Sequence, residues 1–233
     1  MAVLLLIQYS CGDYFFDCLR GNGNVITEER VAEEDIYGVI LEGSYDVEVI
    51  IDDDQKIVIE WDDNLIPYVS TRVTGGDLIV KPGTRHCLRS AYPTRLFVYT
   101  PSVDKVMITG SGTVVCDDLN SGSLKVVITG SGYIDMRNID VQTVNAEITG
   151  SGTILLEGTA DLTDFSITGS GKFRTFDLVR ETCIAKISGS GDMQVFASDL
   201  LDCTISGSGN VYYRGNPRVV AHISGSGNII DSN

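Results

Sequence analysis

The sequence predicts an all-β protein: a parallel β-solenoid with about 20 residues per coil, preceded by an N-terminal β-meander cap. Three observations lead to this fold. A tripeptide recurs at a nearly constant interval, apolar and polar side chains alternate on both sides of it, and helical spacing of apolar residues is lacking. Because connections between parallel strands of one sheet are nearly always right-handed, we expect a right-handed β-helix.

The tripeptide is Gly-Ser-Gly, which occurs seven times at intervals of 18 to 20 residues and holds 14 of the 25 glycines. Ile and then Thr or Ser precede each copy, and an apolar residue stands two positions after it. Stacked coils would place the copies in a ladder along one corner, since glycine tolerates positive φ and has no Cβ to meet the next coil. The predicted ladder consists of Gly110, Gly112, Gly130, Gly132, Gly150, Gly152, Gly169, Gly171, Gly189, Gly191, Gly207, Gly209, Gly225 and Gly227.

Upstream of each copy the residues alternate with a period of two, which is typical of a strand with one buried face. The positions expected to point inward are Val106, Val126, Ala146, Phe165, Ala185, Cys203 and Ala221. The positions between them are mostly polar and include His222 in the last repeat. A single repeat cannot bury its own apolar face, so successive repeats must stack about 4.8 Å apart.

We divide the chain into a leader and linker (1–24), a cap of β-strands (25–105) and the repeat solenoid (106–233). Within the cap, turn residues separate six predicted strands: Tyr37–Leu41, Tyr45–Ile51, Lys56–Trp61, Tyr68–Val73, Leu78–Lys81 and Leu96–Tyr99. Gly43-Ser44-Tyr45 resembles a degenerate triad and indicates that coiling begins there. We expect the cap to cover one solenoid edge and the edge after the seventh triad to stay open, which favours a homo-oligomer.

The charge balance limits the partners of the chain. Seventeen Lys and Arg face 32 Asp and Glu, a net charge of −15, which argues against nucleic acid and against an anionic membrane surface. The acidic excess is concentrated between Glu28 and Asp63, where we interpret it as a solvated surface. Asp52–Asp54 suits a hairpin turn better than a calcium site, because the alternating ligands of a calcium loop are absent.

The N-terminus suggests export. An apolar run, Ala2–Ile7, is followed by Ser10-Cys11, as in a bacterial lipoprotein signal that ends at a lipidated Cys11. The alternatives are a truncated start or a buried first strand. The other cysteines are Cys18, Cys87, Cys116, Cys183 and Cys203, and none has the spacing of a zinc or redox motif. Cys116, Cys183 and Cys203 fall on inward positions and are expected to be small core residues.

Catalytic patterns are scarce. The two histidines are His86, in a predicted loop, and His222, on an outward position. The repeated serine lacks the Gly-x-Ser-x-Gly context of a hydrolase nucleophile, and no carboxylate cluster of a β-helix glycosidase is evident. We therefore predict no enzyme, no cofactor and no metal site. Tyr133, Tyr212 and Tyr213 are expected to be exposed and could stack on sugars or on a protein partner.

The Ile-Thr/Ser-Gly-Ser-Gly-x-apolar unit, the Gly21-Asn22-Gly23-Asn24-Val25 segment and the Tyr37–Ile51 strand pair resemble the putative auto-transporter adhesin head GIN domain family. The resemblance covers about residues 21 to 230. It implies a secreted or lipid-anchored β-solenoid of the bacterial cell envelope. It carries no catalytic residues to this chain.

The sequence therefore favours a non-enzymatic, exported cell-envelope protein whose solenoid presents a surface for adhesion or partner binding. The partner would be a glycan or a surface protein, with a lipid anchor at Cys11 and a homo-oligomer as further expectations. Two alternatives stay open: a carbohydrate-active β-helix enzyme, and a purely structural or assembly element of the envelope.

Overall fold

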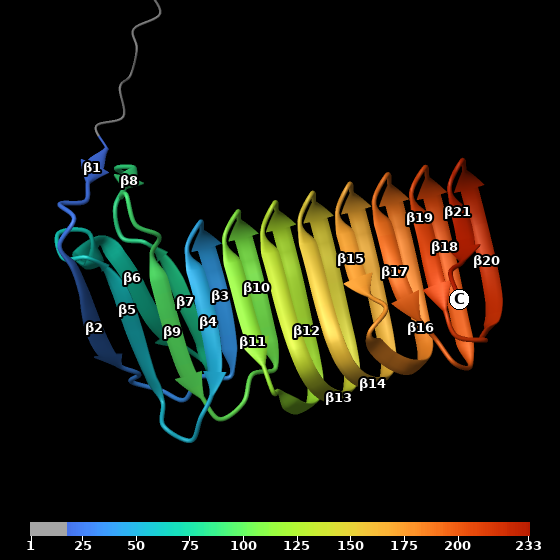
Figure 1. Ribbon diagram of the computed structural model, residues 1–233, viewed down its shortest axis with the longest axis horizontal. Coiled ribbons are helices and arrows are strands. Elements are labelled where there is room, and N and C mark those ends of the chain that lie inside the picture. The colour runs from blue at the N-terminus through green and yellow to red at the C-terminus, as the bar shows by residue number, and fades with distance from the viewer. Residues whose placement is uncertain (1–17) are drawn as a thin grey trace, which may run out of the picture.

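The computed structural model describes residues 18–233 and shows an elongated stack of β-strands (Figure 1). The all-β solenoid predicted from the sequence is confirmed. Among the described residues the helical structure is a single 3-10 turn, η1 (Ile66–Tyr68).

Each coil of the repeat climbs through one strand into a Gly-Ser-Gly corner and descends through a second strand. The climbing strands form what we call the first sheet and the descending strands the second sheet. The strands are β10 (Lys105–Gly110), β11 (Thr113–Asp117), β12 (Asn120–Gly130), β13 (Tyr133–Gly150), β14 (Thr153–Gly169), β15 (Lys172–Thr175), β16 (Leu178–Gly189), β17 (Asp192–Phe196), β18 (Leu200–Gly207), β19 (Asn210–Arg214), β20 (Arg218–Gly225) and β21 (Asn228–Asp231). β13 and β14 continue around the lower turn and so contribute to both sheets.

All pairings in the repeat are parallel, and they align the corners of successive coils: Gly110 pairs with Gly130, and Gly130 with Gly150. The first glycine of each triad has positive φ, for example +124° at Gly130. A Cβ on Gly130 would lie 2.5 Å from the carbonyl oxygen of Gly110, and one on Gly152 would lie 2.6 Å from Cγ2 of Ile128. Both glycines of the triad are therefore dictated by the close approach of the coils, the first also by its backbone conformation.

The solenoid begins inside the N-terminal region. β3 (Gly38–Gly43) and β4 (Asp46–Ile51) form a coil whose corner glycine, Gly43, pairs with Gly110. On its other side this coil pairs in parallel with β7 (Asp77–Pro82) and β9 (Arg95–Thr100). The chain thus forms β3 and β4, adds β7 and β9 on one side of them, and then crosses to the other side to begin β10. Gly43-Ser44-Tyr45 is indeed a degenerate triad.

Antiparallel strands close the N-terminal end. β5 (Lys56–Asp62) pairs with β9, β2 (Val25–Val31) pairs with β5, and β6 (Val69–Thr74) pairs with β7. The region predicted as a meander is therefore partly parallel coil and partly antiparallel cover. A short parallel pair, β1 (Leu19–Arg20) with β8 (Leu88–Arg89), projects beyond the cap and was not predicted (Figure 1).

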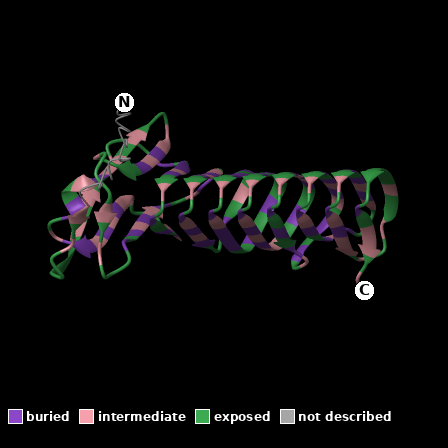
Figure 2. Cartoon of the chain, turned by 90° about the horizontal axis from the view of Figure 1, so that it is seen from above, coloured by how far each residue is buried: buried purple, intermediate pink, exposed green. Residues whose placement is uncertain are grey.

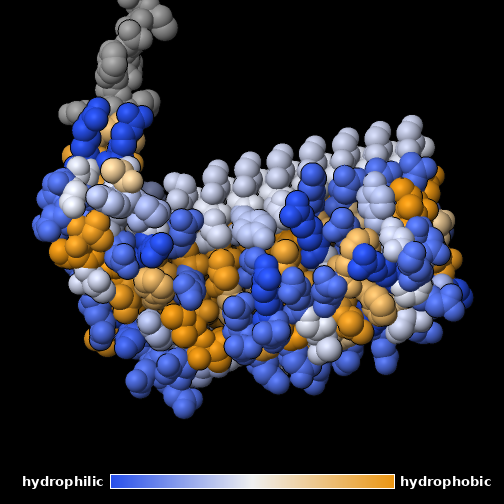
Figure 3. Space-filling model, viewed as in Figure 1, coloured by the Kyte–Doolittle hydropathy of each residue, from blue (hydrophilic) through white to orange (hydrophobic). Residues whose placement is uncertain are grey.

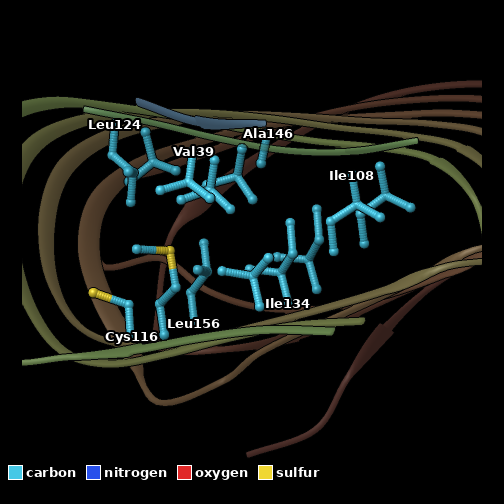
Figure 4. Packing of buried hydrophobic residues seen from close by; sticks show 14 of the residues in the cluster. Val39, Ile108, Cys116, Leu124, Ile134, Ala146 and Leu156 are labelled. Atoms are coloured by element: carbon cyan, nitrogen blue, oxygen red, sulfur yellow. The ribbon is translucent and has the colours of Figure 1, made fainter. Parts of the chain in front are cut away.

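The core lies between the two sheets. Val39, Ile108 and Leu124 point from the first sheet toward Cys116 and Ile134 of the second (Figure 4). The inward positions predicted from the two-residue alternation are buried up to Cys203. Ala221 was expected to be inward as well but is exposed, as is Ile223 at 46%, because the last coil has no neighbour on its outer side among the described residues (Figure 2).

Candidate interaction surfaces

The corner ladder forms a narrow ridge along the length of the solenoid, visible as the pale upper edge in Figure 3. The middle serine of every triad is exposed. Its backbone N–H donates to the corner glycine one coil back, as from Ser131 to Gly110 at 2.9 Å and from Ser151 to Gly130 at 2.8 Å. The ridge is thus held by its backbone, and its hydroxyl groups face solvent.

A second feature is a row of outward side chains that crosses the second sheet at one register level, which we call the second-sheet row. Its members are aligned by strand pairing: Val58, Phe97, Glu48, Val115, Asp135, Leu155, Arg174, Gln194, Tyr212 and Ile230. The six apolar or aromatic members are all half-buried. Charged and amide groups are interspersed among them, so the row offers both apolar contact area and polar groups to a partner.

At the centre of this row a polar cluster is pre-formed. Nε of Arg137 donates to Oδ1 of Asp135 at 2.9 Å, the hydroxyl of Tyr133 donates to Oδ2 of Asp135 at 3.1 Å, and Arg137 lies 3.8 Å from Glu157. Partial burial, with Asp135 next to the ring, raises the pKa of Tyr133 above its ordinary value. The carboxylates raise the pKa of Arg137. The cluster therefore holds its charges in fixed, mutually paired positions.

A groove of about 690 Å³ opens at the N-terminal end of the ridge. Its lining includes Tyr45, Trp61, His86 and Tyr92. Nε1 of Trp61 donates to the carbonyl oxygen of Tyr92 at 3.1 Å, and burial raises the pKa of Tyr45 to about 12. His86, predicted only to lie in a loop, is thus placed on the wall of this groove.

A disulfide joins Cys18 to Cys87 across 69 residues and fixes β1 against β8. The sequence analysis missed it. Neither cysteine falls on an inward position of the two-residue alternation. This was the one sequence signal that distinguished them from the three core cysteines. Their pairing depends on the path of the cap, which no local pattern reveals.

The remaining described cysteines, Cys116, Cys183 and Cys203, are free and buried, as predicted. Burial raises the pKa of Cys116 and of Cys203 to about 12, so both are neutral core thiols. Cys183 pairs in register with Leu201, two positions from Cys203, so the two thiols are not register partners. Cys11, the candidate lipidation site, lies outside the described residues.

The structure separates the other residues considered for chemistry. His222 is exposed, and Asp164 is paired with Lys186 at 3.1 Å. Oδ1 of Asp52 accepts a hydrogen bond from the backbone of Asp54, as in a turn. Tyr133, Tyr212 and Tyr213, expected to be exposed, are half-buried. Across residues 18–233 no group of three or more His, Cys, Asp or Glu side chains is placed to hold a metal ion.

Arg180 is the one large charged side chain in the core of the described chain, 1% exposed. Its guanidinium donates to the hydroxyl of Thr163 at 3.0 Å and to the carbonyl and hydroxyl oxygens of Thr175, and it lies 4.8 Å from the ring centroid of Phe165. Its Nε has no hydrogen-bond partner among the described residues. The two-residue alternation in the sequence predicted neither a core position nor a functional role for Arg180.

Three solved structures have this fold. A putative adhesin from Bacteroides fragilis is 20% identical with a TM-score of 0.85, covering 92% of this chain and 100% of its own. A putative lipid binding protein from Parabacteroides distasonis is 26% identical with a TM-score of 0.76, covering 92% and 99%. A putative adhesin from Parabacteroides merdae is 24% identical with a TM-score of 0.72, covering 93% and 100%.

No curated protein matches the chain. A helix of the length and hydropathy needed to cross a membrane is not found in residues 18–233. The family model described as putative auto-transporter adhesin, head GIN domain, matches residues 37–217, which include the coil of β3 and β4, the cap strands β5 to β9 and most of the repeat. With this match over more than half of its length, the chain belongs to the family of putative auto-transporter adhesin head GIN domains.

Proposed function

We propose that this protein is a non-enzymatic component of the bacterial cell envelope whose solenoid presents the second-sheet row to a glycan or a surface protein. The family, described as putative adhesins, and two of the similar solved structures, also described as putative adhesins, support binding at a surface. The Cys18–Cys87 disulfide supports export, because disulfides persist mainly in oxidising compartments outside the cytosol.

The observation that carries the proposal is the second-sheet row itself. Side chains in register on a sheet face extend over many strands without interruption, and the two-sheet core holds the strands that carry them. Half-buried apolar groups lose little conformational freedom on contact, and the Asp135–Arg137–Tyr133 cluster adds polar groups already fixed in place. Such a surface suits an extended partner better than a small molecule.

A carbohydrate-active enzyme is the alternative. It would need two carboxyl groups flanking a substrate, one of them free to donate a proton. In the polar cluster Asp135 accepts hydrogen bonds from Arg137, and Glu157 forms an ion pair with the same guanidinium at 3.8 Å, so both carboxylates face a positive charge. A purely structural role would leave the second-sheet row without a ligand.

The test is binding of the folded chain to a glycan array and to envelope proteins, with Leu155→Arg as the disrupting variant. Leu162, on the same strand but outside the row, is 39% exposed and provides the matched control Leu162→Arg. We expect at least tenfold weaker binding for Leu155→Arg and no change for Leu162→Arg. Equal binding by the two variants, or no ligand found on the glycan array or among the envelope proteins, would contradict the proposed surface.

Location is tested separately, by mass spectrometry of the native N-terminus. An acylated Cys11 in the membrane fraction is the expected result. An intact Met1 in a soluble cytosolic fraction would overturn the envelope assignment.

A further inference from the structure

The projecting end of the cap has an unusual charge. We call residues 18–24 and 83–94 the tip; they include β1, β8 and the disulfide that joins them. The tip carries Arg20, Arg85 and Arg89, together with His86, and contains no Asp or Glu. A chain with a net charge of −15 thus has an end of positive formal charge, although Asp17 directly precedes it.

The cations of the tip are exposed and make no ion pair among residues 18–233. Arg20 and Arg89 are register partners in the β1–β8 pair, so two like charges lie side by side. The disulfide next to this pair prevents them from separating freely. Like charges held together in this way repel one another, and an external anion would relieve the repulsion.

Two acidic groups beside the tip are engaged in hydrogen bonds, and the acidic turn Asp52–Asp54 is distant, whereas Asp46 and Glu60 lie in register with Arg95, just after the tip. Asp62 is buried and accepts hydrogen bonds from the backbone of Gly23 and the hydroxyl of Ser90. Asp63, at the base of the tip, accepts from the amides of Asn22 and Asn24, which lower its pKa.

The acidic turn Asp52–Asp54 follows the far end of β4. Asp46 at the near end pairs with Arg95, just after the tip, whereas Ile51 pairs with Thr100. Six residues of strand separate the two levels by roughly 20 Å. Since the Debye length is about 8 Å at physiological ionic strength, the field of this turn is largely screened at the tip.

We propose that the tip docks onto the anionic headgroups of a lipid bilayer. The proposal rests on the envelope location above and names the surface that the cap contacts there. The net charge of the whole chain argues against such a surface, but only groups within about a Debye length decide the contact. The tip is also the part of the described chain next to Cys11, since the seven-residue interval from Cys11 to Cys18 spans at most about 25 Å.

This geometry identifies the occupant. A lipid attached at Cys11 would keep the tip within reach of the same bilayer, so headgroup phosphates are the anions it meets first. The two or three acyl chains of a lipoprotein cysteine already hold a protein at the bilayer. The tip would add an electrostatic contact and would direct the cap end of the solenoid toward the membrane.

The experiment uses the full chain carrying Cys11→Ser, with the Cys18–Cys87 disulfide formed, so that no acyl chain contributes. Trp61 is the only tryptophan and lies beside the tip, which makes it an energy donor to dansyl-labelled headgroups in vesicles. We expect energy transfer with phosphatidylglycerol-rich vesicles at low salt, loss of transfer at 0.5 M salt because the Debye length shrinks, and none with phosphatidylcholine vesicles.

The disrupting variant is Arg85→Gln with Arg89→Gln, and the matched control is Lys172→Gln with Arg218→Gln, two exposed basic residues on the solenoid outside the second-sheet row. At about 1 kcal/mol per basic residue near an anionic surface, the tip variant should bind roughly 30-fold more weakly and the control should be unchanged. Equal weakening of both pairs, transfer to neutral vesicles, or no transfer at all would overturn the proposal. None of these results bears on whether the native chain is exported, which the N-terminal mass measures.

Discussion

The cap and the solenoid are held together in different ways. In the solenoid the same few positions recur in every coil, and apolar stacking with parallel pairing accounts for nearly all contacts. The cap shares the apolar core and adds single, long-range polar contacts. Arg30 alone donates to the carbonyl oxygens of Val69 and Ile66 and to the hydroxyl of Thr71. Periodicity therefore determines one region, and particular side-chain partnerships determine the other.

The largest effect should come from breaking the periodic region at its corner. Gly150→Val places a β-branched side chain at φ +124° against the carbonyl of Gly130. We expect a loss of more than about 4 kcal/mol in the free energy of unfolding, measured by denaturant titration. Gly122→Val is the control, because a Cβ there meets nothing within 4 Å, and it should cost less than about 1 kcal/mol. Similar costs for both variants would argue against the ladder as a packing constraint.

The second effect separates the two regions. Replacing Cys18 and Cys87 by serine releases a 69-residue closure in the cap and should cost about 2–4 kcal/mol. Hydrogen exchange should show the loss in β1, β8 and the strands near them, with β12 to β18 protected as before. Uniform loss of protection along the solenoid would show that the cap and the coils unfold as one unit.

A third prediction concerns Arg180, whose buried side chain makes polar contacts inside the solenoid like those that Arg30 makes in the cap. Thr175→Val keeps the side-chain shape but removes the hydroxyl that accepts from this buried guanidinium, and should cost about 1–3 kcal/mol. Adding Arg180→Met should recover most of the loss, since an apolar side chain needs no such partner. The double-mutant cycle measures the coupling. Additive costs would mean that Thr175 acts independently of Arg180.

The smallest effect on stability is expected at the exposed end coil. Ile223 is 46% exposed, so Ile223→Lys should change the free energy of unfolding by less than about 1 kcal/mol. If a second copy covers Ile223, light scattering should show a dimer for the native chain and a monomer for the variant. If the native chain stays monomeric at high concentration, the dimer hypothesis is wrong.

The same contrast explains what the sequence could predict. Period-two alternation and the recurring triad are local signals. They predicted the strands on both sides of each triad, the inward residues up to Cys203 and the resemblance of Gly43 to a corner, but not the exposure of Ala221. The parallel β7–β3 and β9–β4 pairs could not be found, because the strands that pair are not neighbours in sequence. The Cys18–Cys87 bridge and the environment of Arg180 were missed for the same reason.

The two interaction surfaces also depend on contacts between segments that are distant in sequence. The second-sheet row needed the register of ten strands before it could be recognised as one surface. The tip needed the fold to bring residues near 20 and near 89 together. In the sequence their arginines are scattered among an acidic majority, and net charge alone predicted the opposite behaviour.

The order in which the chain visits its strands has a consequence for biogenesis. After β1 and β2, the strands β3 and β4 are made, the strands β5 to β9 follow, and β10 then adds to an edge that is already shaped. Every later coil extends the edge left by the one before it. A chain that emerges amino end first from a translocation channel could therefore add one coil at a time to the folded β3–β4 coil, before its last residues have emerged. Because β7 and β9 cover the other side of that coil, further coils add on one side only.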